Sequence, residues 1–360
     1  MMLFDYSSIA INMLLKIDNL LEASDKCIRG VSWKESVQSY YMKRLIWIAN
    51  TCRKLESGTY KPKRCVEFKI HERGKAREIR SYHISDRVVQ KAFNEKILKP
   101  KIYPTLIYDN SASRKGKGTD FAIRRVKCFL QRHYRKYGNN GYALVMDFSN
   151  YFAQINRNIL MNKLAKHLTD EELAMLKAIM SNEREGLGLG SEINQTCAIF
   201  YASDIDHFVK EKLRIKGYER YMDDLVLIHH DRDYLKYCQA EITKLCERDK
   251  ITVNTKKCKI INLKTDYIPY LKKQFRLTGT GKVIVRPIKK NLTRRKKRLK
   301  RMKELLDKDV LSIENIVGSY KSWRGYVAKY DTPKRALAAV DKLFGELFGS
   351  EILKEIKKGR

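Results

Sequence analysis

Residues 217–230, GYERYMDDLVLIHH, most constrain the fold, because two adjacent carboxylates interrupt an apolar, β-prone run. The flanking residues are typical of strands, so the segment predicts a β-hairpin with Asp223 and Asp224 at its turn. Aspartate favours turns in general. Paired acids held by two strands can also bind a divalent cation, since Mg²⁺ prefers hard oxygen ligands.

A third carboxylate, Asp147, closes a second apolar run, YALVMDF. If this run is a neighbouring strand, Asp147 comes to the same place as the Asp-Asp pair. Two ions about 4 Å apart can activate an attacking hydroxyl and stabilise a leaving oxygen. The three acids together therefore predict metal-dependent phosphoryl chemistry.

The charge balance points to a polyanionic partner. The chain has 75 Lys and Arg against 41 Asp and Glu, a net charge of +34. A field of this sign attracts phosphate polymers and speeds their encounter. The excess is concentrated in RPIKKNLTRRKKRLKRMK, residues 286–303, which contains no acid.

The cysteines and the N-terminus indicate the compartment. Eight cysteines are dispersed, with no CxxC pair and no zinc-ligand spacing, as in reduced cytosolic proteins. The first 21 residues have apolar positions at helical spacing, including Ile11 and Leu14, and an acid at Asp5 in place of a basic signal-peptide start. No run is long enough to span a membrane. We expect a cytoplasmic protein without a membrane partner.

Hydrophobic periodicity predicts an α+β chain with a helical C-terminal appendage. Strands or hairpins are expected at 65–82, 142–148, 217–230 and 251–262. Helices are expected within 1–60 and at 88–103, 121–137, 168–180, 196–213 and 233–250, and two more after residue 286, separated near 307–312. Glycine-bearing loops are expected at 111–120 and 186–195.

The motifs resemble those of reverse transcriptases. Tyr221-Met222-Asp223-Asp224 looks like the active-site box of that family. MDFSNYF resembles its first catalytic carboxylate box, ITVNTKKCKI the segment after the palm hairpin, and residues 61–93 the fingers of bacterial members. The similarity extends over roughly residues 60–330, in the family's motif order.

The resemblance implies a right-hand polymerase fold with fingers, palm and helical thumb. The expected parts are an N-terminal helical segment (1–60), fingers (61–140), a palm (141–285, with an inserted helical segment at 157–185) and a basic helical thumb (286–360). Asp147 and Asp223 would be the principal ligands of two Mg²⁺ ions, or Mn²⁺. Asp224 would complete the acidic cluster, and the backbone carbonyl of Phe148 would add a ligand.

The family's nucleotide contacts carry over to Lys75, Arg77, Phe152 and Lys257, and to Leu189, Gly190 and Gln195 of the loop 189–195, which in that family lies under the templating base and incoming nucleotide. Arg77 matches the fingers arginine along the incoming triphosphate, with Lys75 beside it; a solvated hairpin tip is the plainer interpretation. Phe152 matches an aromatic steric gate against the ribose 2′-OH, or simply packs in the core. Lys257 falls near a lysine proposed to protonate pyrophosphate, and an exposed lysine explains it equally well.

Nucleic-acid contacts are expected from the motif tyrosine and from the basic tail. Lysine and arginine spread around a helix would bind template–primer phosphates without reading sequence. The residues assigned to this role are Tyr221, Arg294, Arg295, Lys297, Arg298 and Arg301.

The loop LGSEINQ (189–195) discriminates among subtypes. Leu189-Gly190 at its start and Gln195 at its end resemble the polymerases of diversity-generating retroelements, relatives of group II intron enzymes. Asn194 departs from their usual serine, and Lys272 from the glycine of their primer-gripping turn. The resemblance implies error-prone copying, particularly opposite adenine, with dNTPs, a structured template RNA, a cDNA primer and a small basic accessory protein oligomer as partners.

Other functions remain open. Antiphage-defence, orphan and group II-like reverse transcriptases also vary in this loop. A non-enzymatic RNA-binding protein that assists splicing could keep the palm fold, although it would not need the three acids. An RNA-dependent RNA polymerase would need room for the 2′-OH, which Phe152 would take.

Overall fold

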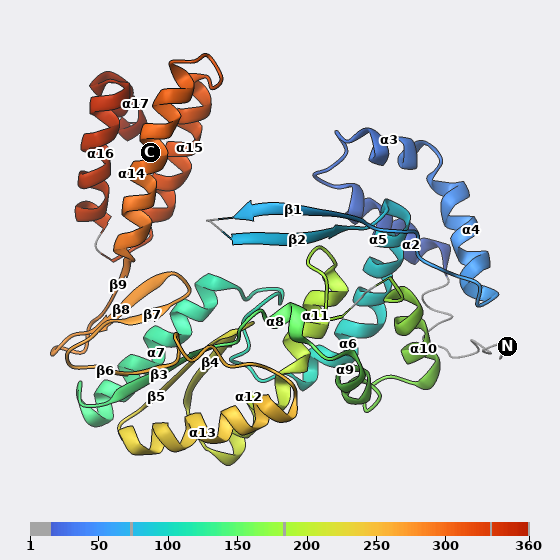
Figure 1. Cartoon of the computed structure of the whole chain (residues 1–360), viewed down its shortest axis with the longest axis horizontal. Helices are drawn as coiled ribbons and strands as arrows, with labels where there is room; N and C mark the ends of the chain where they lie inside the picture. The colour runs from blue at the N-terminus through green and yellow to red at the C-terminus, as the bar shows by residue number, and fades with distance from the viewer. Residues whose placement is uncertain (1–15, 73–74, 183–184, 332, 359–360) are drawn as a thin grey trace.

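The computed structural model describes residues 16–72, 75–182, 185–331 and 333–358. The predicted contributions of Ile11 and Leu14 to an N-terminal helix lie outside these residues. Within them, no helix has the length and apolar character needed to cross a bilayer. Figure 1 shows the arrangement: a helical N-terminal part, a long hairpin above a central sheet, and a C-terminal helical bundle on the far side.

The N-terminal part and the long hairpin follow the sequence pattern. The helices are α2 (Ile17–Ile28), α3 (Glu35–Met42) and α4 (Arg44–Glu56). The predicted hairpin is confirmed as β1 (Val66–Glu72) paired antiparallel with β2 (Lys75–Ser81). It extends toward the C-terminal bundle over the central sheet (Figure 1).

A continuous helical stretch follows, as the sequence predicts. It consists of α5 (Ile84–Phe93), a π-helical turn (Asn94–Leu98) and α6 (Lys99–Ile102), and a 3₁₀ turn (Tyr103–Thr105) ends it. The basic loop then leads into α7 (Thr119–Tyr137).

The central sheet is antiparallel with strand order β4-β5-β3-β6. Its strands are β3 (Tyr142–Asp147), β4 (Gly217–Tyr221), β5 (Asp224–His229) and β6 (Lys259–Asn262). Successive side chains of a strand point to opposite faces. Leu144 and Met146 accordingly pack in one core cluster and Ala143 and Val145 in another.

The helices of the middle of the chain mostly pack on the first of these faces. They are α8 (Tyr151–Gln154), α9 (Arg157–Leu164), α10 (Asp170–Ile179), α11 (Glu192–Tyr201), α12 (Ser203–His207), a π-helical turn (Phe208–Lys212) and α13 (Arg232–Arg248). The other face packs against α7 and a small three-stranded sheet, β7 (Ile268–Tyr270), β8 (Lys273–Leu277) and β9 (Val283–Pro287).

The C-terminal bundle has its own core. Its helices are α14 (Lys289–Leu306), α15 (Ile313–Ala328), α16 (Pro333–Phe348) and α17 (Ser350–Lys358). Leu299, Tyr320, Val340 and Phe344 are buried among them. The expected break near 307–312 is confirmed, but the expectation of two helices is wrong, because α16 and α17 follow.

Two sequence boundaries also need correction. The strand expected at 251–262 is confined to β6, because the backbone of residues 254–258 turns back on itself: the amides of Lys257 and Cys258 both donate to the carbonyl of Asn254. The helix expected from 196 starts at Glu192, whose acidic side chain suits a first helical turn. Asn194 and Gln195 therefore lie in α11 and not in the loop.

Candidate active site

The three predicted acids meet at one end of the central sheet. Asp147 ends β3 and lies directly opposite Asp224, the first residue of β5. Tyr221 pairs with Asp224 across the two-residue turn, Met222 and Asp223. The backbone amide of the residue after Asp147, Phe148, donates to the carbonyl of Asp223 (3.0 Å), so the β3 strand and the turn are joined beyond the ladder.

The turn adopts an uncommon backbone conformation. Met222 has φ 55°, in the left-handed region that non-glycine residues seldom occupy. A fully buried arginine from β4 accounts for it: Arg220 Nη1 donates to the Met222 carbonyl (2.9 Å). The same guanidinium binds both carboxylate oxygens of Asp206 on α12 (2.7 Å each).

Asp206 is itself fully buried and further satisfied. Tyr218 donates its hydroxyl to Asp206 Oδ1 (2.6 Å), and the Asn110 amide donates to Oδ2 (3.2 Å). Sequence reasoning missed this network. The one signal available was a charged pair, Glu219-Arg220, inside a strand whose neighbours are apolar, because such residues are buried only when they have partners.

Two cationic or polar neighbours hold the carboxylate of Asp147. Lys257 Nζ lies 2.6 Å from Oδ2, and the Asn254 amide donates to Oδ1 (3.2 Å). The turn formed by residues 254–258 brings both side chains to the sheet's end. Lys257 was predicted near the site on resemblance alone, and the structure gives it a defined partner; Asn254 was not predicted.

The acids crowd one another electrostatically. Burial, together with the charges of Asp223 and Asp147, raises the pKa of Asp224 to about 7. Burial and Asp147 also raise the pKa of Asp223, whereas Lys257 and Arg77 oppose that rise. For Lys257, burial would lower the pKa, but the hydrogen bond and charge of Asp147 outweigh it and raise the pKa above its usual value.

The donor chemistry fits a divalent cation, since three carboxylates supply hard oxygen ligands and their mutual repulsion would be relieved by positive charge. As the side chains stand, however, no three His, Cys, Asp or Glu residues of the described ranges are grouped so as to hold a metal ion. The carboxylate of Asp147 is engaged by Lys257 and Asn254 instead.

The comparison with known families decides what this arrangement belongs to. A family model described as reverse transcriptase (RNA-dependent DNA polymerase) matches residues 61–310. The chain belongs to this reverse transcriptase family. Reverse transcriptases generally use divalent metal ions, in keeping with the acidic cluster.

Solved structures of telomerases have similar backbones. Apo telomerase from Candida tropicalis, truncated from its C-terminal domain, is 15% identical with a TM-score of 0.48, over 61% of this chain and 54% of that one. Telomerase from Candida albicans in complex with a fragment of telomeric RNA is 12% identical with a TM-score of 0.47, over 89% and 69%. This chain thus spans just over half of the first telomerase. No curated protein matches significantly.

The candidate nucleotide-binding residues of this reverse transcriptase differ in how the structure places them. Arg77 is on β2 with an exposed side chain, and its charge acts on Asp223. The side chain of Lys75 lies outside the described residues. Phe152 follows on α8, half-buried and edge-on to Tyr151 (ring centroids 6.2 Å apart), so it packs on the core without being fully enclosed by it. Tyr221 is half-buried.

The discriminating loop is bonded to the long hairpin. The amide of Arg80 on β2 donates to the carbonyl of Leu189 (2.8 Å), and Ile79 pairs with Leu189 as in a parallel bridge. Gly190 has φ 128°, and a Cβ there would collide with the carbonyl oxygen of Arg80. Gln195 is exposed, with its Oε1 3.3 Å from the hydroxyl of Ser113, its donor.

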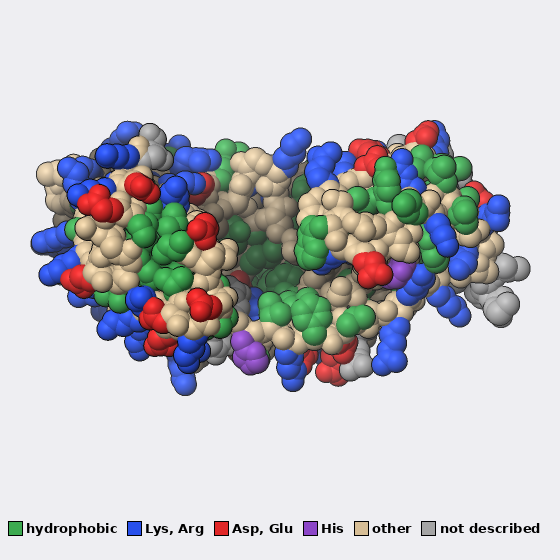
Figure 2. Space-filling view, turned by 90° about the horizontal axis from the view of Figure 1, so that it is seen from above, with side chains coloured by type: hydrophobic (Ala, Val, Ile, Leu, Met, Phe, Trp, Pro, Cys, Tyr) green, Lys and Arg blue, Asp and Glu red, His purple; other side chains and the backbone are tan. Residues whose placement is uncertain are grey.

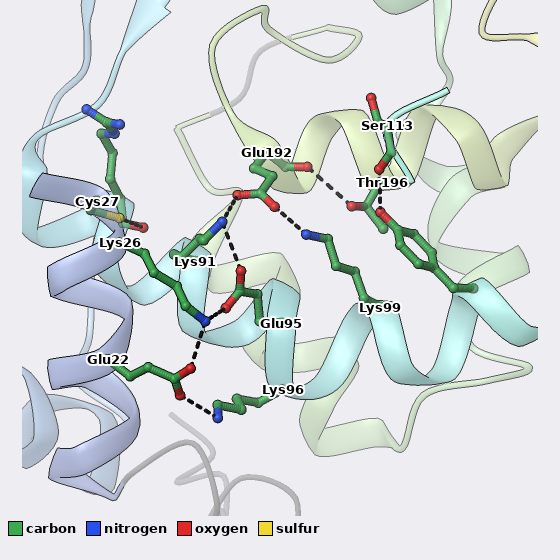
Figure 3. A network of polar contacts seen from close by, with 12 residues as sticks. Glu22, Lys26, Cys27, Lys91, Glu95, Lys96, Lys99, Ser113, Glu192 and Thr196 are labelled. Atoms are coloured by element: carbon green, nitrogen blue, oxygen red, sulfur yellow. Dashed lines mark hydrogen bonds and ion pairs between the residues drawn. The ribbon is translucent and has the colours of Figure 1, made fainter. Parts of the chain in front are cut away.

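Ion pairs hold the base of this loop. Glu192, two residues after Gly190, lies between Lys91 (2.7 Å) and Lys99. Figure 3 shows the pairs continuing through Glu95 to Lys26 on the N-terminal helix α2. The loop is therefore tied to both the hairpin and the N-terminal helices.

The basic residues predicted on α14 to bind nucleic acid fall into an exposed group and one buried residue. Arg294, Lys297, Arg298 and Arg301 are exposed and available to nucleic acid. Arg295 is not: it is 6% exposed, 5.5 Å from the ring centroids of both Tyr320 and Trp323, and bonded to Ser319. Its position on the apolar stripe of the helix, with Leu292 and Leu299, explains why it turns inward.

Proposed function

We propose that this chain is an RNA-directed DNA polymerase that copies a template RNA into cDNA from dNTPs. The observation that carries the proposal is the placement of Asp147 opposite Asp224 in a chain of the reverse transcriptase family. The hand-like division follows: residues 61–140 as fingers, 141–285 as palm with the helical insert 157–185, and 286–360 as thumb, preceded by the helical segment 1–60.

Asp147, Asp223 and the carbonyl of Phe148 would hold two Mg²⁺ ions, with Asp224 completing the cluster. When bound, such ions activate the attacking 3′-hydroxyl and stabilise the leaving pyrophosphate oxygen. The chain's own residues do the rest. Arg77 brings positive charge over Asp223 from the hairpin, where its planar fork suits a triphosphate. Lys257 pairs with Asp147 (2.6 Å) and would supply an ammonium proton to the pyrophosphate leaving group.

The test is primer extension on an RNA template with Mg²⁺ and dNTPs. Wild type is compared with Asp223→Asn and with Asp233→Asn, a matched loss of one exposed acid on α13. We expect synthesis to fall by at least a hundredfold in the first variant and to persist in the second. Equal synthesis by Asp223→Asn and wild type would remove this residue from the chemistry.

Within this activity we propose error-prone copying, as in a diversity-generating retroelement. The support is Leu189, an aliphatic side chain in a loop tied to β2 next to the predicted nucleotide site. Leu189→Gln should reduce misincorporation opposite template adenine while leaving total synthesis within about threefold. Accurate products from the wild-type chain would favour the antiphage-defence or orphan alternative instead.

A diversity-generating retroelement polymerase would act in the cytoplasm with three partners. These are a structured template RNA, a cDNA primer and a small basic accessory protein oligomer. Proteins encoded by neighbouring genes are the candidates to add back. A gain in synthesis on the native RNA when one of them is added would support an accessory role. No gain with any of them would argue against a requirement for one.

A further inference from the structure

The bundle carries a basic groove between α14 and α16, and of its lining residues Lys297 alone is among those assigned above to template–primer binding. Its volume is about 440 Å³. The residues that matter here are Thr293, Lys296, Lys297 and Lys300 from α14, and Lys342 and Glu346 from α16.

The groove follows from helical spacing. Positions 293, 296, 297 and 300 form one i, i+3, i+4, i+7 stripe on α14, and 339, 342, 343 and 346 form the matching stripe on α16. The buried stripe of α14 contains Leu299 and Met302. At about 100° per residue, Arg298 and Arg301 fall on the side of this stripe opposite to Lys296 and Lys300. The basic arc of the helix therefore has a lysine side at the groove and an arginine side away from it, with Lys297 between them.

The lysine side of α14 is on the side of the bundle away from the long hairpin. It faces α16, whereas Arg295 on the apolar stripe reaches toward Tyr320 and Trp323 of α15. In Figure 1, α16 is on the outer side of the bundle and α15 nearer the long hairpin. Figure 2 shows Lys and Arg along the outer edge of the bundle, away from the hollow that separates the bundle from the hairpin and N-terminal helices.

The groove's charge is not neutralised internally. In the part of the chain that the structure describes, none of Lys296, Lys297, Lys300 and Lys342 has an ion-pair partner, and Glu346 is the one acid that lines the groove. Lysines one turn apart on a helix repel one another. Such a cluster is relieved by a bound polyanion, and the groove residues of α14, from Thr293 to Lys300, extend over about 10 Å.

We propose that this groove binds the phosphate backbone of a nucleic-acid duplex outside the copying site. Lysine is a point-charge phosphate binder that does not need a planar, base-reading geometry. Single strands are bound mainly by stacking on aromatic rings, and the groove lining contains none. A duplex flanking the copied segment, either folded template RNA or the finished product, is therefore the occupant, and it would be held without sequence preference.

The test uses Lys296→Gln/Lys300→Gln/Lys342→Gln beside a control with the same change in charge, Lys166→Gln/Lys177→Gln/Lys212→Gln, three exposed lysines outside the bundle. Fluorescence anisotropy over a salt series measures binding to a short primer–template and to the same ligand with a duplex flank. The flank is made once as RNA and once as DNA. Thermal melting confirms that both variants are folded.

For the groove variant we expect at least a tenfold loss of affinity for a flanked ligand. We also expect a salt slope reduced by about 2–3, because three phosphate contacts are removed. Affinity for the short ligand, and its extension, should stay within twofold. A larger loss with the RNA flank assigns the groove to the template, and a larger loss with the DNA flank to the product.

Three outcomes would overturn the proposal. The first is an equal loss of affinity in the control variant, and the second is an equal loss of affinity for the short ligand. The third is no loss of affinity for either flanked ligand, which would make an acidic protein the better occupant of the groove. Because extension of the short ligand is measured separately, failure of the groove proposal is distinguishable from failure of the polymerase proposal.

Discussion

Arg220 reaches across the tip of the hairpin and donates to the carbonyl of Met222, the residue just before the aspartate pair. The contact links a buried ion pair in the core to the backbone that aims Asp223. An arginine can do this because its fork supplies separate donors to Asp206, to the Ile199 carbonyl and to the turn at once.

Arg220→Lys keeps the charge beside Asp206 but removes the reach to Met222. We expect kcat to fall at least tenfold, with the KM for the template–primer nearly unchanged, because the turn loses the donor that holds it. Tyr218→Phe is the matched control, since it removes another donor to Asp206 without touching the turn. It should cost about 1 kcal/mol of stability and leave kcat intact. An equal loss of kcat in both, at equal stability, would refute a specific role for the turn contact.

Glu219 predicts a pH dependence of stability. It is fully buried on β4, and burial raises its pKa to about 8. A carboxyl whose folded pKa is raised stabilises the fold below its unfolded pKa, and this stability is lost as pH rises through 8. The melting temperature of Glu219→Gln minus that of wild type should therefore be more positive at pH 9 than at pH 6. Glu247→Gln, which removes an exposed acid on α13, should show no such trend.

Gly190 predicts a steric requirement at the loop. Gly190→Ala places a methyl group against the Arg80 carbonyl and should separate Leu189 from β2. Gly118 has a similar backbone (φ 113°) with open space around it, so Gly118→Ala isolates the strain of the dihedral, roughly 1–3 kcal/mol. We expect primer extension to fall at least tenfold more in the first variant than in the second. Similar losses would show that strain alone matters.

Phe152 predicts sugar discrimination. Phe152→Ala should admit ribonucleotides, so that the preference for dNTPs over rNTPs falls at least tenfold in single-nucleotide incorporation. Phe208→Ala removes another half-buried ring from the same core cluster and should leave the preference unchanged. Unaltered selectivity in Phe152→Ala would assign the ring to packing alone.

The sequence predicted the elements that are determined by residues close together in the chain. The hairpins and the long α7 follow from periodicity and turn residues within a few positions, whereas the pairing of Asp147 with the Asp-Asp turn was expected from the chemistry of a metal site. Asp206, Asn254 and the inward turn of Arg295 could not be predicted in this way. Their partners are 14, 107 and 24 residues distant, and a buried polar residue is explained only when its partner is known.

One buried hydrogen bond, from the Tyr270 hydroxyl to Glu219, joins the small sheet to the catalytic strand β4. The small sheet ends at Pro287, and the bundle begins two residues later at Lys289. A swing of the bundle that carries β7 with it must therefore pull on β4, two residues before Tyr221. In the proposed polymerase, a variant that weakens the bundle's hold on a duplex would therefore be expected to disturb the alignment of the acids as well.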